Sequence, residues 1–280
     1  MTRTPTQWNL LNETVKGPKK RHSQDASLAL SVEHGSAVVL AVADGHGSAA
    51  YFRSDVGSAW AVAEFADCAR TFAAAAVRAD QEGGSGAQLH NLARDLPHRV
   101  VRGWRRRVQA CEYNSPAHGG LPGTVRPPAD LLPYGSTLIG AVLTANLLVA
   151  WQLGDGECAV VDGQGDVQLP LYVGEEFGDV TDSLCRDEAW RWMRMHWQPL
   201  SRTDAVRAVV ISTDGLSKSF TEHAGYLDFV GGTYRRVQER GVGTVQGQLD
   251  SWLSRAAAHS GDDTTLVGAF AVPDLSQDRT

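Results

Sequence analysis

The chain has 280 residues, of which 42% are hydrophobic, and carries a formal net charge of −6 at pH 7. This length and composition can close a sizeable hydrophobic core, whereas the negative charge offers no broad basic face for a nucleic acid backbone. Four scattered cysteines without a C-x-x-C pair suggest neither a zinc knuckle nor a redox motif, and no stretch is apolar enough to span a bilayer, so we expect a cytoplasmic monomer without membrane contact.

The first half of the chain reads as a hairpin followed by two long helices. Alternating apolar residues predict strands over Ala26–Val32 and Ala37–Ala43, with a turn at EHGS between them. Ala-rich sequence predicts a helix from Ser54 to about Ala79, ended by QEGGSG, and a second helix follows over about Gln88–Cys111. The basic run RGWRRRVQ on that second helix is either a solvated face or a docking patch for an acidic protein segment.

The second half returns to strands and ends in helices. Strands are predicted over Ser136–Leu143, over Leu147–Gln152, and within ECAVVDGQGDVQLP, AVRAVVIS and TTLVGAFAV. Helices are expected over Arg186–Trp197, Gly231–Arg240 and Val245–His259. This order predicts an α+β fold in which a β-sandwich of two antiparallel sheets is flanked by pairs of α-helices, in four layers. No linker divides the chain, so residues 1–280 are expected to form one domain with a core over about 17–272.

Aspartates stand where several buried-looking strands end. Asp44 follows VVLAVA, Asp155 follows LVAWQLG, Asp214 follows RAVVIST, and Asp262 and Asp263 directly precede TTLVGAF. A single Asp-Gly after a strand is most often only a turn, but carboxylates gathered at one rim repel one another unless a cation neutralises them. Oxygen-rich clusters of this kind suit Mg²⁺ or Mn²⁺. The set therefore indicates a metal site.

The motifs VADGHGS, GSTL, QLGDG, ISTDGL and GDDTTLV follow one another in the order found in the metal-dependent protein phosphatases, the protein phosphatase 2C family, and KKRHSQDAS resembles the opening signature of that family. The matching segments run from about Gly17 to Phe270. The resemblance implies a bacterial-type enzyme that hydrolyses phosphoserine and phosphothreonine in proteins, by in-line attack of a metal-bridged water on phosphorus. It implies two divalent ions, Mn²⁺ or Mg²⁺, and a phosphorylated partner that is the target of a serine/threonine kinase.

The same resemblance implies the metal ligands. Asp44 corresponds to the bridging ligand, and the backbone carbonyl of Gly45 to a further one. Asp214 and Asp262 correspond to ligands of the first metal, with Asp263, which stands where the family usually has Asn, as the other choice of register. Asp155 corresponds to the aspartate of a third, weaker metal site.

Other positions correspond to the surroundings of the metals. Asp25 is counted with the metal site, whereas Gln24 replaces a glutamate and cannot supply the same anionic ligand. Lys20 takes the place of the phosphate-binding arginine, with Arg21 beside it, and a lysine holds phosphate only as a point charge. His46 is the expected proton donor to the departing oxygen, and with Asp44 it forms the catalytic pair. The GST motif, Gly135-Ser136-Thr137, is expected to support the site from beneath.

Two other functions stay open at this point. The changes at Gln24 and Lys20 favour a catalytically weak module that binds phosphoproteins or regulates a partner, whereas the intact aspartates oppose it. A second possibility is a phosphatase dedicated to one regulatory partner. The segment 173–200 corresponds to the mobile flap of the family, and its WRWMRMHW cluster is expected to be a core-facing helix rather than a substrate groove.

Overall fold

The computed structural model describes residues 7–114, 130–172, 181–201 and 205–272. Its centre consists of two five-stranded antiparallel sheets. The first sheet has the strand order β1 (Trp8–Val15), β10 (Thr264–Ala271), β9 (Ala208–Ser212), β6 (Glu157–Val161) and β7 (Val167–Gln168). The second sheet has the order β2 (Ala26–Val32), β3 (Ala37–Ala43), β4 (Leu138–Thr144), β5 (Leu147–Leu153) and β8 (Arg194–Pro199).

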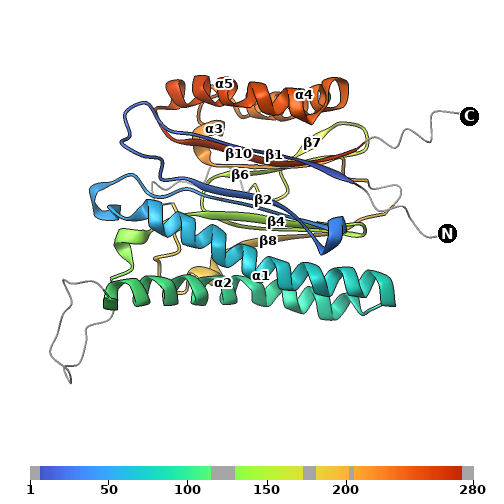
Figure 1. The fold of residues 1–280 in the computed structure, drawn as a ribbon, viewed down its shortest axis with the longest axis horizontal. Helices are drawn as coiled ribbons and strands as arrows, with labels where there is room; N and C mark the ends of the chain where they lie inside the picture. The colour runs from blue at the N-terminus through green and yellow to red at the C-terminus, as the bar shows by residue number, and fades with distance from the viewer. Residues whose placement is uncertain (1–6, 115–129, 173–180, 202–204, 273–280) are drawn as a thin grey trace, which may run out of the picture.

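Helices cover the outer faces of both sheets, which makes four layers (Figure 1). The long helices α1 (Ser54–Glu82) and α2 (Gly86–Asn114) cover the second sheet, and α4 (His223–Arg240) and α5 (Val242–Ser260) cover the first. A one-turn helix, α3 (Asp214–Ser217), follows β9. The predicted α+β sandwich is therefore confirmed. No helix among the described residues has the length and apolar character needed to cross a membrane.

Strand β3 explains how one apolar run serves two interfaces. All seven of its residues are buried. Ala37, Val39 and Ala41 pack towards α1, whereas Val38 and Leu40 pack against the other sheet. Because successive strand side chains point to opposite faces, a strand covered on both sides reads as a continuous apolar run.

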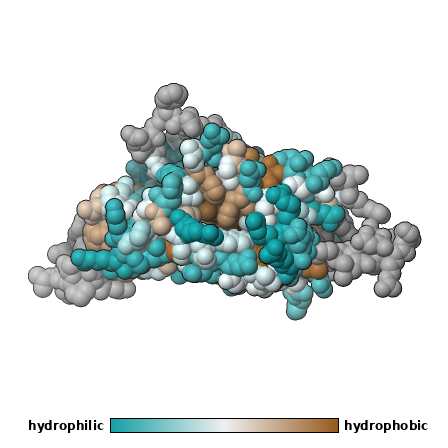
Figure 2. All heavy atoms as spheres, turned by 90° about the horizontal axis from the view of Figure 1, so that it is seen from above, coloured by the Kyte–Doolittle hydropathy of each residue, from teal (hydrophilic) through white to brown (hydrophobic). Residues whose placement is uncertain are grey.

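The helices over the first sheet, α4 and α5, have one buried side and one side turned to solvent. Seen from above in Figure 2, that side of the molecule is mostly hydrophilic, with hydrophobic side chains gathered near its middle. Both helices bury one side, which includes Tyr226, Val230, Leu249 and Leu253, against the first sheet. This one-sided burial is the amphipathic pattern that the sequence predicts for terminal helices, although α4 starts eight residues earlier than the expected Gly231.

The helix predicted over Arg186–Trp197 is wrong. The chain instead forms a short 3-10 turn over Ala189–Arg191 and then strand β8, which pairs with β5. The spacing of Trp190, Met193 and Trp197 suits a helix, but Met193, Met195 and Trp197 also follow the two-residue period of a strand. Strand pairing decides between the two. The WRWMRMHW cluster does contribute core side chains, from an edge strand rather than a helix.

A flap is expected over residues 173–200, and the last residues of that segment, Arg194–Pro199, form strand β8 of the second sheet. Residues 173–180 of that segment lie outside the described residues. Strand β1 was not expected from the sequence. It is an edge strand with Leu11 as its one fully buried residue, so its apolar periodicity is weak.

Candidate active site

The topology brings the aspartate-bearing strand ends to one edge of the sandwich. Strands β3 and β5 are both antiparallel to β4, so they run in the same direction and end together. Asp44 follows β3 directly, and Asp155 stands two residues after β5. In the other sheet β9 ends beside the start of β10, which places Asp214 near Asp262 and Asp263.

The DGHG loop is anchored on the GST motif, as the sequence predicts. The Asp44 N–H donates to Thr137 Oγ1 at 3.0 Å, and the Thr137 N–H donates back to the Asp44 carbonyl at 2.8 Å. The His46 N–H donates to the Gly135 carbonyl at 3.2 Å. These bonds hold the backbone of the loop and leave the Asp44 carboxyl group free to face the other aspartates.

Glycine is required at position 45 because the backbone is crowded there. A Cβ atom on Gly45 would lie 2.7 Å from the carbonyl oxygens of both Gln24 and Ser54. The Gln24 side chain adds to this packing, since its Nε2 donates to the His46 carbonyl at 3.0 Å and to Ser54 Oγ at 2.6 Å. Gln24 therefore clamps the loop through its amide group, which an anionic glutamate could not do in the same way.

Three carboxyl groups form the buried centre of the site. Burial, followed by the nearby charges of Asp25 and Asp214, raises the pKa of Asp44 well above its usual range. Burial likewise raises the pKa of Asp25 to about 7, although hydrogen bonds from hydroxyl groups oppose the shift. Burial and Asp155 raise the pKa of Asp214. In the absence of a cation, these side chains are held together against their mutual repulsion.

Two lysines reach into this cluster. Lys218 Nζ lies 3.2 Å from Asp155 Oδ2 and also pairs closely with Asp214. Lys20 Nζ pairs closely with Asp262 and lies 3.2 Å from Asp263 Oδ2. Burial alone would lower the pKa of each lysine, but the facing carboxylates raise both values overall. Each ammonium group thus neutralises two carboxylates.

The two neighbouring aspartates, Asp262 and Asp263, have different surroundings. Asp263 has a fully buried side chain that accepts the N–H groups of Gly17 and Gln24, both at 2.7 Å. Asp262 is 44% exposed in its side chain and contributes to the electrostatic environment of Asp44. Asp263 therefore anchors the opening segment, and its charge also raises the pKa of Asp25, so both aspartates border the site.

The donor set suits a hard divalent cation. Asp25 Oδ1 and Asp214 Oδ1 are buried and have no hydrogen-bond partner. Within the described part of the chain, no three His, Cys, Asp or Glu side chains are already spaced to hold an ion. Lys20 and Lys218 pair with the outer carboxylates. Unpaired buried carboxylate oxygens with raised pKa values are what a divalent ion would satisfy.

His46 lies at the rim of the cluster. Its ring packs edge-on against Tyr51, with 4.7 Å between centroids, and Gly135 makes room because a Cβ there would lie 2.7 Å from Tyr51. Burial lowers the pKa of His46, and the charge of Asp155 partly offsets the effect. The imidazole is therefore neutral near pH 7. Arg21, the other expected phosphate ligand, is exposed.

Sequence reasoning missed the residues that complete the site. Thr213 and Thr265 donate hydroxyl hydrogen bonds to Asp25 Oδ2 at 2.8 and 2.7 Å. Both are adjacent to recognised motifs, in STDG and DDTT, which is the signal that could have found them. Lys218 was also missed, although it stands four residues after Asp214, the spacing that brings two side chains together on a helix.

Comparison with known proteins agrees with this architecture. The structure resembles the serine/threonine phosphatase Stp1 from Staphylococcus aureus, with a TM-score of 0.60 and 13% identity over 96% of each chain. It also resembles the S. agalactiae serine/threonine phosphatase, with a TM-score of 0.58 and 15% identity over 95% of this chain and 100% of the other. The catalytic domain of the phosphatase PstP, solved with two manganese ions, matches with a TM-score of 0.56 and 17% identity over 96% of this chain and 100% of that domain.

At these identities the structural likeness establishes the fold, and the family rests on the sequence. No curated protein sequence matches the chain. The sequence profile described as protein phosphatase 2C matches residues 18–254, which is most of the chain. The protein therefore belongs to the protein phosphatase 2C family, a family of protein serine/threonine phosphatases.

Proposed function

We propose that the protein hydrolyses phosphoserine and phosphothreonine in a protein substrate with the help of divalent metal ions, within one catalytic unit that spans about residues 17–272. The proposal rests on one observation. The carboxyl groups of Asp25, Asp44 and Asp214 lie together in one buried cluster, and two of their oxygens have no hydrogen-bond partner. Burial of like charges together costs folding free energy, and binding of a cation lowers that cost.

The candidate ligands come from three motifs. Asp44 and the carbonyl of Gly45 would hold the metal ions, with Asp214 and Asp262 as further ligands and Asp25 in support. When bound, Mn²⁺ or Mg²⁺ would lower the pKa of the attacking water and neutralise the charge of the phosphate. The Thr213 and Thr265 hydroxyl groups orient Asp25, so its free oxygen stays directed into the cluster.

His46 is proposed to supply the proton that the departing serine or threonine oxygen needs. Its imidazole is neutral near pH 7 in the free protein because burial lowers its pKa. A phosphate dianion beside the ring favours the charged imidazolium form. Binding of the substrate would therefore protonate His46, which could then act as the acid. Lys20 would have to exchange its pairing with Asp262 for the phosphate, with Arg21 as the second cation at the entrance.

We propose two ions rather than three, because Lys218 pairs with Asp155, the aspartate that corresponds to the third site, and at the same time with Asp214. The lysine ammonium group supplies a permanent positive charge at that place. Measurement of bound Mn²⁺ per chain by elemental analysis tests this directly. Lys218→Ala should bind more Mn²⁺ at saturation than the wild type, whereas Lys218→Arg should not, and equal binding by all three proteins would contradict it.

The catalytic proposal is tested by hydrolysis of p-nitrophenyl phosphate with Mn²⁺, Mg²⁺ or chelator, for the wild type beside Asp44→Asn. Activity that requires metal and disappears with Asp44→Asn is expected. Activity that is indifferent to chelator and to the substitution would overturn the proposal. Hydrolysis of phosphoserine and phosphothreonine peptides then defines the substrate class.

One observation favours a second candidate, a phosphoprotein-binding module with little catalysis. The cation expected to bind phosphate, Lys20, is engaged by Asp262 and Asp263, and the outer carboxylates are held by lysines rather than arranged around an ion. Tight binding of phosphopeptides by a folded protein that hydrolyses none of them with saturating Mn²⁺ would support this candidate over the enzyme.

A further inference from the structure

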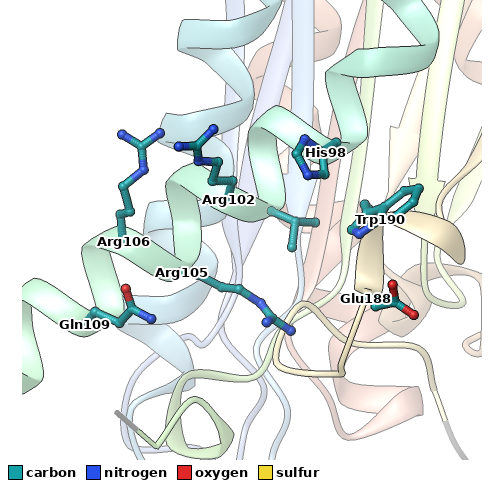
Figure 3. A pocket seen from close by; sticks show the side chains of 8 residues that line it. His98, Arg102, Arg105, Arg106, Gln109, Glu188 and Trp190 are labelled. Carbon is teal, nitrogen blue, oxygen red and sulfur yellow. The ribbon is translucent and has the colours of Figure 1, made fainter. Parts of the chain in front are cut away.

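A groove lies on the outer side of α2, where the helix meets the 3-10 turn Ala189–Arg191. It encloses about 480 Å³, and arginines of the RGWRRRVQ run form one wall. Figure 3 shows Arg102 and Arg106 extending side by side from α2, while Arg105 reaches across towards the segment that carries Glu188. None of these residues belongs to the acidic cluster described above.

Two arginines of this wall have no ion-pair partner among the described residues, and the carboxylate that lines the groove with them, Glu188, pairs with Arg191 at 2.9 Å. Arg102 and Arg106 are exposed, stand four residues apart on one helix face, and make no ion pair with any described residue. Their neighbour Arg107 behaves differently, since it pairs with Glu64 and Asp67 of α1. Like charges at this spacing repel each other, so the pair is an arrangement that folding alone does not favour.

Arg105 adds a partly satisfied donor. It donates to the Arg186 carbonyl at 2.6 Å, and it lies 3.7 Å from Asp187, whose side chain is fully exposed. Its Nε is buried and has no hydrogen-bond partner. A guanidinium group offers five N–H donors in a fixed plane, which matches a carboxylate through two parallel hydrogen bonds. Because this Nε is buried, the donors that the groove presents to a ligand are chiefly those of the exposed Arg102 and Arg106.

An aromatic floor lies beside this wall. Trp190 is half-buried, and its ring meets the ring of His98 edge-on, with 5.5 Å between centroids. Figure 3 shows these two side chains next to each other, His98 from α2 and Trp190 from the segment that carries Glu188. Tryptophan and arginine in a partly desolvated hollow are the residues that dominate binding energy at protein interfaces.

The segment that forms the far side of the groove starts at the candidate active site. Thr181 Oγ1 donates to Asp155 Oδ2 at 3.1 Å, and the Leu184 N–H donates to the Ser136 carbonyl at 2.9 Å. A few residues later the chain reaches Trp190 in the groove. One short segment, residues 181–190, thus connects the candidate active site to the groove.

We propose that the α2 groove binds a carboxylate-rich segment of the phosphoprotein on which the enzyme acts, which is an inference that rests on the proposed function. Charge complementarity identifies the occupant, because Arg102, Arg105 and Arg106 face it in a chain whose net charge is −6. The same net charge opposes binding of a long nucleic acid. The groove therefore selects among phosphoproteins by the acidic residues near their phosphorylation sites.

The test compares two phosphothreonine peptides of equal length, one with an Asp/Glu-rich flank and one with a Gly/Ser flank. The double variant R102E/R106E should raise KM for the acidic peptide at least about tenfold. Its kcat for that peptide, and its hydrolysis of the Gly/Ser peptide and of p-nitrophenyl phosphate, should be unchanged. A matched control, R78E/R94E, makes the same change in net charge with exposed arginines of α1 and α2 outside this groove.

Binding of a fluorescein-labelled, unphosphorylated acidic peptide, followed by anisotropy, keeps the test independent of catalysis. The wild type should bind it, binding should weaken with salt, and only R102E/R106E should lose it. Equal KM values for the two peptides in the wild type, equal effects of the two double variants, or binding to phosphatidylserine vesicles without binding to the peptide would overturn the proposal. Inactivity towards p-nitrophenyl phosphate with intact peptide binding would overturn only the proposed function.

Discussion

Like charges lie close together in two places in the molecule, and the surroundings of the two clusters are opposite. At the acidic edge, Asp25, Asp44 and Asp214 are buried together, and Lys20 and Lys218 close in on the carboxylates around them. On α2, Arg102 and Arg106 stand beside each other at the surface and find no partner among the described residues. Water screens the second cluster but not the first.

This difference separates two kinds of evidence for a ligand. Buried like charges raise the pKa values of their own groups and leave carboxylate oxygens without partners, so the need for a cation is visible in the fold itself. Exposed arginines cost the protein little, and their ligand is inferred from shape, charge and the neighbouring tryptophan. The acidic edge should therefore dominate both activity and pH dependence, while the arginine groove should affect only binding.

The largest effect is expected for Asp44→Asn. Activity with Mn²⁺ should fall at least about 100-fold, because loss even of an outer partner of a metal ligand costs 10–100-fold. With chelator present the same variant should melt at a higher temperature than the wild type, since a neutral amide avoids the burial and like-charge penalties that raise the pKa of Asp44. Hydrolysis of p-nitrophenyl phosphate measures the activity, and calorimetry with and without Mn²⁺ measures the melting temperature. A variant that melts lower in chelator would break the view that this cluster is strained without metal.

The second prediction concerns Glu157, a buried residue beside the cluster. Burial raises the pKa of Glu157 to about 7 from 4.5, so the charged form is penalised in the folded state. The contribution of Glu157 to stability is therefore most favourable below about pH 4.5 and is lost as the pH rises towards 7. In chelator at pH 8, Glu157→Gln should gain on the order of 2 kcal/mol of unfolding free energy over the wild type.

Urea unfolding at pH 5 and pH 8 measures this difference. Most of the gain should vanish at pH 5, where Glu157 is already protonated in the folded protein. Glu222→Gln, at an exposed position, is the matched control and should show no such pH dependence. An equal response of the two variants would contradict the role assigned to burial.

A smaller effect is expected for Lys218→Ala. Removal of the ammonium group leaves the buried Asp214 without its cation, but the lysine itself is mostly exposed, so the loss in chelator should be only about 1 kcal/mol. Saturating Mn²⁺ should restore the stability if an ion replaces the lysine. The wild type and Lys218→Arg serve as references, and an unrestored loss would sharpen the comparison by assigning Lys218 a purely structural role.

The smallest effect belongs to the arginine groove. Arg102→Gln combined with Arg106→Gln should change the unfolding free energy by less than about 0.5 kcal/mol, with a slight gain from relieved repulsion. Arg107→Gln on the same helix should be more costly because it loses Glu64 and Asp67. Chemical denaturation of the three proteins tests this ranking, and a large loss from the double variant would mean that the groove is part of the folding core.

Local sequence patterns were sufficient for most of the architecture. The apolar run of β3, the hairpin over residues 26–43 and the Ala-rich helix α1 each obey one clear period, and each is where the sequence predicts it. The motif order likewise predicted which aspartates meet at one edge. Short segments with two possible periods failed, because Trp190, Met193 and Trp197 suit a helix while Met193, Met195 and Trp197 suit a strand.

By itself, then, the sequence determined the sandwich and the family, and it predicted the aspartates of the candidate site. Only the tertiary structure decided which atoms face them: Lys218 between Asp155 and Asp214, Asp263 as a backbone anchor, and Gln24 as a clamp on the DGHG loop. It also decided that Arg107 is paired while Arg102 and Arg106 are not. Periodicity is a local property that each segment carries alone, whereas these pairings join residues far apart in the chain and depend on how the layers pack.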